Sequence, residues 1–122
     1  MKSIEKLLPK ANAVLQSSDL INTETKKIKN DVFDGYISGF GPSVIMSGLL
    51  PTLSTYAAKN ERIIVLNAIA EIAAIDNATS SDTLITKCIT NYSNKTQLNI
   101  WKEKLINASV ALKLMIRTYQ LK

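Results

Sequence analysis

Few side chains in this sequence are suited to catalysis. It contains no histidine, which removes the usual general base near neutral pH, the histidine-dependent triads and the commonest metal ligand. The single cysteine, Cys88, has no second cysteine to pair with and cannot build a zinc site by itself. Its apolar neighbours in the sequence favour a reduced thiol in the core. We therefore expect no catalytic residue and no cofactor.

Asp31 and Asp34 are the carboxylates whose spacing comes nearest to a metal site. They lie three residues apart in a segment with helical spacing, but no further ligand accompanies them. Lys27 precedes Asp31 by four residues, which is an ordinary ion-pair spacing on a helix. The pattern is typical of a solvated helix face, and we expect neither a metal site nor an enzyme that depends on one.

Residues 39–51, GFGPSVIMSGLLP, lie where the glycines of the chain are concentrated. A phosphate-binding loop would follow a strand and carry a Lys-Ser/Thr pair, whereas these glycines follow a predicted helix with no lysine beside them. The stretch instead predicts a corner between two helices. Gly39 would end the first helix in the left-handed conformation, and Pro42 would open the next, where its missing N–H costs nothing. Gly48 would lie inside the second helix, where close approach of a neighbouring helix would offset a cost of about 1 kcal/mol relative to alanine.

Apolar residues recur at helical spacing along almost the whole chain. The predicted helices span residues 3–17, 24–38, 42–59, 61–76, 82–92 and 95–120. The apolar stripe of the third one consists of Ile45, Leu49, Leu53 and Tyr56. No segment keeps the alternation of a strand, and a chain of 122 residues with 46% hydrophobic content is long enough to bury a core. We predict an all-α fold, a single compact bundle of five to six helices over residues 1–122.

The most apolar run of the sequence, residues 63–75, has the features of a buried helix. It contains Asn67 and Glu71 and is shorter than the roughly 20 apolar residues that cross a bilayer. The N-terminal stretch has no long apolar core followed by a cleavage site, so it does not resemble a signal peptide. We expect a cytoplasmic protein without a membrane partner.

The net charge of +5 is confined to the last predicted helix and the residues after it. Basic and acidic side chains balance up to residue 94, whereas Glu103 alone opposes the basic residues beyond it. Cations at the end of a helix oppose its dipole, which would account for Lys113 and Arg117. The cations at its start, where the dipole disfavours them, are Lys95, Lys102 and Lys104. A basic stripe on one helix indicates a polyanion partner.

A regular apolar seam separates the buried side of that helix from its free side. It consists of Leu98, Trp101, Leu105, Ala108, Leu112, Met115 and Tyr119, at spacings of three and four. Lys102, Lys113 and Arg117 lie outside the seam and are the first candidates to contact a nucleic acid. The second candidates, on the helix predicted over residues 24–38, are Lys26, Lys27 and Lys29. Contacts of this kind bind phosphates, so the binding would not depend on base sequence.

The stretch after Pro42 resembles a motif of one prokaryotic family. Pro42-x-x-Ile45-x-x-Gly48-Leu49-x-x-Thr52-Leu53-x-x-Tyr56 is similar, apart from a shift of one position, to P-x-x-I-x-x-x-GL-x-x-T-L-x-F/Y. That motif belongs to the small helical subunit of the type III-B CRISPR RAMP (Cmr) effector complex. The segment ALKLMIRTY, residues 111–119, looks like the terminal helix of the family, with Met115 where a tryptophan is expected. The resemblance covers residues 36–58 and 95–119.

The resemblance implies a non-catalytic structural subunit of an antiviral ribonucleoprotein. Several copies would stack along a filament of backbone subunits and line the groove that holds the guide RNA and the target RNA. The RNA-binding residues would then be the lysines and the arginine named above. Its partners would be the other Cmr subunits, copies of itself and the two RNAs, and it would have no small-molecule substrate.

Other functions stay open from the sequence. The small subunit of a type III-A or type I complex would also be helical and basic. A small DNA-binding regulator would need a recognition helix that presents Arg, Asn or Gln to base edges, and the sequence provides few arginines for one. A protein-interaction module of another kind is a further alternative.

The lack of candidate catalytic groups predicts that the purified chain is neither a nuclease nor a nucleotidase. It should not cleave RNA or release phosphate from ATP, with or without Mg²⁺ or Mn²⁺, because it has no histidine and no cluster of ligands. Denaturing gels and a phosphate-release assay check this. Metal-dependent cleavage that survives stringent purification and disappears in Asp31→Ala would contradict the prediction.

Overall fold

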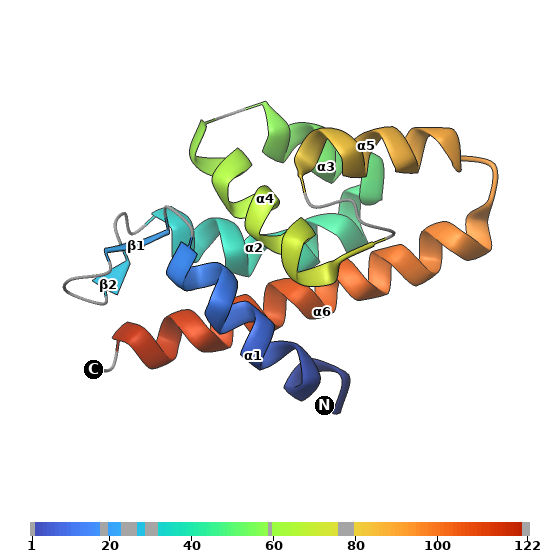
Figure 1. Cartoon of the computed structure of the whole chain (residues 1–122). Coiled ribbons are helices and arrows are strands. Elements are labelled where there is room, and N and C mark those ends of the chain that lie inside the picture. The colour runs from blue at the N-terminus through green and yellow to red at the C-terminus, as the bar shows by residue number, and fades with distance from the viewer. Residues whose placement is uncertain are drawn as a thin grey trace.

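Six helices and one short strand pair make up the described part of the chain (Figure 1). The computed structural model describes the backbone of residues 2–17, 20–22, 27–28, 32–58, 60–75 and 80–120. In chain order the elements are α1 (Lys2–Ser17), β1 (Ile21–Asn22), β2 (Lys27–Ile28), α2 (Val32–Ser47), α3 (Leu49–Ala57), α4 (Asn60–Ala73), α5 (Ser81–Thr90) and α6 (Lys95–Gln120). The predicted all-α bundle is confirmed.

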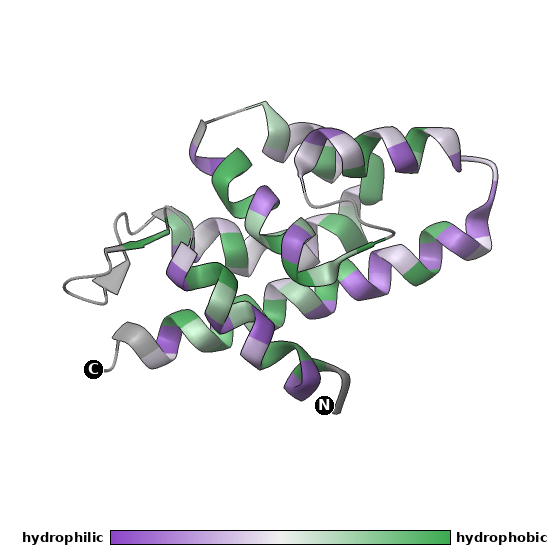
Figure 2. Cartoon of the chain, in the orientation of Figure 1, coloured by the Kyte–Doolittle hydropathy of each residue, from purple (hydrophilic) through white to green (hydrophobic). Residues whose placement is uncertain are grey.

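The longest helix, α6, lies against α1, α2 and α4, and Figure 1 shows α1 crossing it. Its buried apolar residues are Trp101, Leu105, Ala108, Ala111, Leu112 and Ile116, and Leu98 and Met115 are half-buried. In Figure 2 hydrophobic and hydrophilic bands alternate along α6, as expected for a helix with one side in the core. The predicted seam is confirmed, except at Tyr119, whose side chain lies outside the described residues.

Helix α4 lies in the middle of the bundle, as its apolar sequence predicted. It packs against the five other helices, and Val65, Leu66 and Ile69 are fully buried. Asn67 is half-buried, and its Oδ1 accepts a hydrogen bond of 2.8 Å from the backbone N–H of Ser81, which fixes the start of α5 against α4. Of the described helices, none is both long and apolar enough to cross a bilayer.

The helix predicted over residues 24–38 is wrong at Lys27 and Ile28, which form β2, and residues 24–26 and 29–31 lie outside the described residues. Strand β1 pairs with β2 in an antiparallel arrangement that places Ile21 opposite Ile28, and α2 begins only at Val32. Apolar residues at 28, 32 and 36 have helical spacing, but three positions are too few to exclude another backbone conformation. Ile21 is buried, and its backbone pairing with Ile28 holds that residue in a strand.

The corner predicted at Gly39 and Pro42 is also wrong, because α2 continues through both residues to Ser47. The buried residues of α2 follow each other at spacings of four, three and four: Phe33, Ile37, Phe40 and Val44. Burial of this stripe outweighs the backbone hydrogen bond that Pro42 cannot donate, and Pro42 itself lies exposed. The stripe was readable from the sequence and is a stronger signal than the glycines and the proline taken singly.

The break between α2 and α3 falls at Gly48. This residue is the N-cap of α3 and has φ 98° and ψ 164°, a backbone conformation that essentially only glycine adopts. A Cβ at this position would lie 3.6 Å from Cδ of Pro51, which is ordinary van der Waals contact. The predicted close approach of another helix is therefore wrong, and the backbone conformation is what requires glycine.

Tyr56 of α3 holds α3 against α2. Its hydroxyl donates a hydrogen bond of 2.6 Å to the backbone carbonyl of Tyr36, and its ring meets Phe40 edge-on with centroids 5.4 Å apart. Burial raises the pKa of the Tyr56 hydroxyl above its ordinary value of 10.0, because the phenolate would lose its hydration, so the hydroxyl remains a donor well above neutral pH. A hydrogen bond of 2.9 Å between the hydroxyls of Ser43 and Thr52 joins the two helices at a second point.

We predict that Gly48→Ala destabilises the bundle by about 1–3 kcal/mol, because alanine is strained in this backbone conformation. Gly35→Ala is the matched control, since Gly35 lies inside α2 and a Cβ there would meet nothing within 4 Å. The control should gain about 0.5–1 kcal/mol from the higher helix propensity of alanine. Denaturant unfolding followed by circular dichroism measures both. A midpoint for Gly48→Ala at or above that of the unchanged chain would rule out the conformational role.

Candidate functional site

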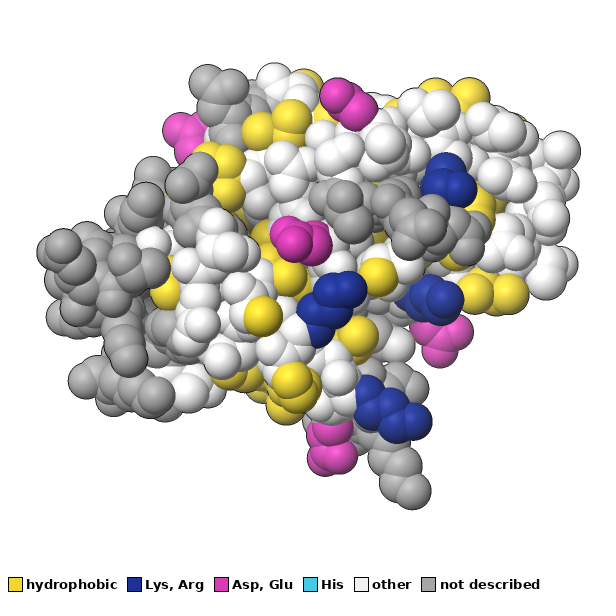
Figure 3. Space-filling view, viewed as in Figure 1, with side chains coloured by type: hydrophobic (Ala, Val, Ile, Leu, Met, Phe, Trp, Pro, Cys, Tyr) yellow, Lys and Arg dark blue, Asp and Glu magenta, His cyan; other side chains and the backbone are white. Residues whose placement is uncertain are grey.

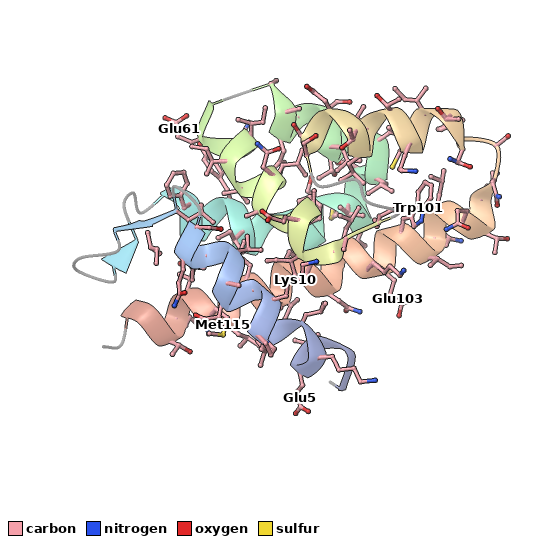
Figure 4. All side chains as sticks on the ribbon, in the orientation of Figure 1. Glu5, Lys10, Glu61, Trp101, Glu103 and Met115 are labelled. Atoms are coloured by element: carbon pink, nitrogen blue, oxygen red, sulfur yellow. The ribbon has the colours of Figure 1, made fainter. Side chains whose placement is uncertain are left out.

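The first half of α6, residues 95–104, carries cationic side chains at the surface. Lys95 and Lys104 are exposed and Lys102 is half-buried, whereas Trp101 is buried and anchors this half to the bundle. Figure 1 shows it extending past α1 toward the turn that follows α5. In Figure 4 Trp101 points from α6 toward α5, and Glu103 points away from the bundle. We call residues 95–104 the α6 arm.

The α6 arm presents its lysines on two sides. Lys95 and Lys102 are seven residues apart, about two helical turns, and so share one side. Lys104 follows Lys102 by two residues, about 200° around the helix, and lies on the other side. The arm is helical from its first turn because Asn94 Oδ1 accepts a hydrogen bond of 3.1 Å from the backbone N–H of Gln97.

Lys113 is not free to reach a polyanion, contrary to the prediction. Its ammonium donates a hydrogen bond to Ser38 Oγ and lies 3.9 Å from Asp34 Oδ1. Ser38 Oγ donates in turn to the backbone carbonyl of Asp34 at 2.8 Å. Lys113 therefore ties α6 to α2. Arg117, about one turn further along α6, is exposed and forms no ion pair with the part of the chain that the structure describes.

The second set of predicted cations falls mostly outside the described residues. Lys26 and Lys29 lie outside them, and of Lys27 only the backbone, in β2, is described. Asp31 lies outside them as well. Among the residues that are described, no three Asp, Glu or Cys side chains gather into a group that could hold a metal ion.

A groove runs between α2 and α6 beside Lys113. One hollow of about 240 Å³ is lined mainly by apolar side chains, and a second of about 360 Å³ continues it along α6 to Lys102. Ile45 and Ile106 border both hollows. Ile45 was predicted to belong to a buried stripe, but its side chain is 68% exposed, because the break at Gly48 turns α3 relative to α2.

A further hollow of about 420 Å³ lies between α1, α4 and α6. Lys6, Lys104 and Glu103 are among the residues that border it. On the face drawn in Figure 3 basic and acidic side chains stand close to one another. Mixed charge of this kind gives little attraction for a polyanion, so the hollow is a weaker candidate site than the side of α6 that carries Lys95 and Lys102.

Cys88 lies in α5 and is fully buried, as the sequence indicated. Burial raises the pKa of its thiol to about 11, because the thiolate would lose its hydration. A thiol that stays protonated and inaccessible near neutral pH is not a nucleophile.

We predict that native Cys88 does not react with a thiol reagent such as DTNB at pH 8, whereas the unfolded chain reacts at once. The raised pKa also contributes stability that is complete below the ordinary pKa of 9.0 and is lost as the pH rises toward 11. Unfolding midpoints measured between these pH values should therefore fall more steeply for the unchanged chain than for Cys88→Ala. Rapid labelling of the native chain would show that the thiol is accessible.

Comparisons of the chain with models of protein families, with curated proteins and with solved structures find no match. The candidate site therefore depends on the geometry of the α6 arm and of the groove between α2 and α6.

Proposed function

We propose that this chain is a non-catalytic, RNA-binding subunit of a cytoplasmic ribonucleoprotein, and specifically the small subunit of a type III-B CRISPR (Cmr) effector complex. In this role the α6 arm contacts phosphates of the guide or target RNA. Other surfaces contact neighbouring subunits and further copies of the chain. The complex would act in antiviral defence, with its cleavage chemistry in other subunits.

The observation that carries the proposal is the position of Lys95, Lys102 and Lys104 on the α6 arm. The helix dipole does not account for these lysines, because it disfavours a cation in the first turn, where Lys95 lies, and fades beyond that turn. Their side chains form no ion pair with the described residues, and Lys95 and Lys104 are exposed. A polyanion along the arm would pair with these lysines, and its binding is favoured because each phosphate bound releases counterions.

Binding through the arm would be indifferent to RNA sequence. Lysine ammonium groups are point charges that pair with phosphate oxygens, whereas base edges are read by bidentate groups such as arginine. The arm contains no arginine, and its one aromatic residue, Trp101, is buried. Such indifference suits a subunit that must accept any target paired to any guide. It also argues against the alternative of a DNA-binding regulator that reads bases.

We predict that a complex reconstituted with the Lys95→Ala, Lys102→Ala, Lys104→Ala chain binds target RNA more weakly, whatever the sequence of the RNA. The slope of log affinity against log salt concentration should become shallower by about 0.7 for each phosphate that the variant no longer binds. Affinities measured over a series of salt concentrations give this slope.

The matched control removes three cations from α1 and α5, in a Lys2→Ala, Lys10→Ala, Lys87→Ala chain. Lys10 and Lys87 border neither of the two hollows beside the arm. The control lowers the net charge equally, and it should assemble normally and leave the salt slope unchanged. Equal weakening by both variants would mean that net charge governs binding and the arm does not. Unchanged target affinity in a complex that lacks the chain altogether would exclude the RNA-lining role.

A further inference from the structure

Apolar side chains are exposed along both edges of the groove between α2 and α6. Among the residues that line it, Ile45 on α2 is 68% exposed, and Val110 and Leu114 on α6 are 36% and 37% exposed. Met46, next to Ile45 and outside the lining, is 85% exposed. Pro42 is exposed too, and its spacing from Ile45 and Met46 by three and four residues makes them neighbours on one helix face. Contiguous apolar surface of this kind indicates a site that another molecule covers.

The groove has a closed floor and a considerable length. Gly41 is buried at its base, where a Cβ would lie 3.7 Å from Cγ2 of Ile106, so α2 and α6 approach closely there. The two hollows share Ile45 and Ile106 and together run along α6 from Lys102 to Arg117. Fifteen residues of helix rise about 22 Å, which is the length of about four turns of a partner helix.

The charge around the groove is positive at one end. Asp34 lies beside Lys113, and Glu103 borders the same hollow as Lys102, so both of these lysines have an acidic neighbour. Arg117 borders the groove at its other end and pairs with no carboxylate among the described residues. A ligand with an acidic group at that end would complement it.

RNA and a second copy of the chain fit the groove less well than a different protein does. The phosphates of RNA are charged, whereas the hollow between Ile45 and Leu114 is lined mainly by apolar side chains. None of the described residues that line the groove is an aromatic ring on which a base could stack. A second copy could offer Ile89 and Tyr92, which are 61% and 66% exposed. The charged residues nearest to these two in the sequence are Lys87 and Lys95, which would repel Arg117.

We propose that the groove between α2 and α6 binds an amphipathic helix of another protein. Its apolar side would fill the groove between Ile45 and Leu114, and an acidic residue near one end would pair with Arg117. An amphipathic helix held in an apolar groove is a recurrent mode of recognition between proteins. The inference goes beyond the proposed RNA-binding function, because it concerns a protein ligand, and either can fail while the other stands.

Site-specific photo-crosslinking identifies the molecule that binds in the groove. Met46 is replaced by p-benzoylphenylalanine, which its exposed position should tolerate, and Thr86 on the exposed side of α5 is replaced in the control. The cells that produce the chain are irradiated, and the adducts are mapped by mass spectrometry. Position 46 should yield an adduct with an amphipathic, acidic segment of another protein, and position 86 should not. An adduct with RNA, with a second copy or with a segment that lacks acidic residues would overturn the proposal, as would no adduct.

A charge reversal tests the orientation of the bound helix. Arg117→Glu should lower the yield of the adduct at position 46 by about tenfold or more, because it would place like charges together. Lys87→Glu makes the same change of net charge on α5 and should leave the yield within about twofold. Circular dichroism spectra and melting curves confirm that both variants fold. Equal yields in the two variants would overturn the pairing of an acidic residue with Arg117.

Discussion

The burial of one side of α6 is the constraint on which the rest of the structure depends. Helices α1, α2 and α4 all pack against it, and its buried residues run from Trp101 to Ile116. Each large apolar side chain that is fully buried contributes about 1.5–3 kcal/mol, so α6 cannot rotate to expose a different side without losing several such contributions. The positions of its cations follow from this, because a helix that buries one side must present the others to solvent or to side chains at the edge of the core.

The break at Gly48 decides which apolar residues of the middle segment are buried. In a single helix over residues 42–59, Ile45 would share a face with Leu53 and Tyr56. The positive φ at Gly48 redirects the chain, so that Leu53 and Tyr56 enter the core while Ile45 stays at the surface of α2. The hydrogen bond from Tyr56 to the carbonyl of Tyr36 then fixes the two helices against each other. The apolar edge of the groove is thus a consequence of one backbone conformation that only glycine tolerates.

The two halves of α6 use their positive charge differently. In the second half, Lys113 bonds to Ser38 beside Asp34 and so contributes to the packing of α2 on α6. In the α6 arm, Lys95 and Lys104 have no such partner among the described residues. The charge that contributes to packing, at Lys113, therefore lies in a different half of α6 from the charge proposed to bind RNA. The two proposed ligands would adjoin at Lys102, which belongs to the α6 arm and also borders one end of the groove.

The sequence by itself determined the helical class, the central place of α4 and the buried side of α6, because these follow from the spacing of apolar residues along the chain. It also determined the excess of lysine on the α6 arm, which is a matter of composition. It also contained the stripe of Phe33, Ile37, Phe40 and Val44 that carries α2 through Pro42. Only the tertiary structure decided that Ile28 belongs to a strand, that Ile45 is exposed and that Lys113 is engaged. Each of these depends on a distant residue or on where a helix ends, and neither can be read from the spacing of neighbouring residues. Lys113 bonds to Ser38, which lies 75 residues away in the sequence. Ile45 is exposed because the helix breaks at Gly48.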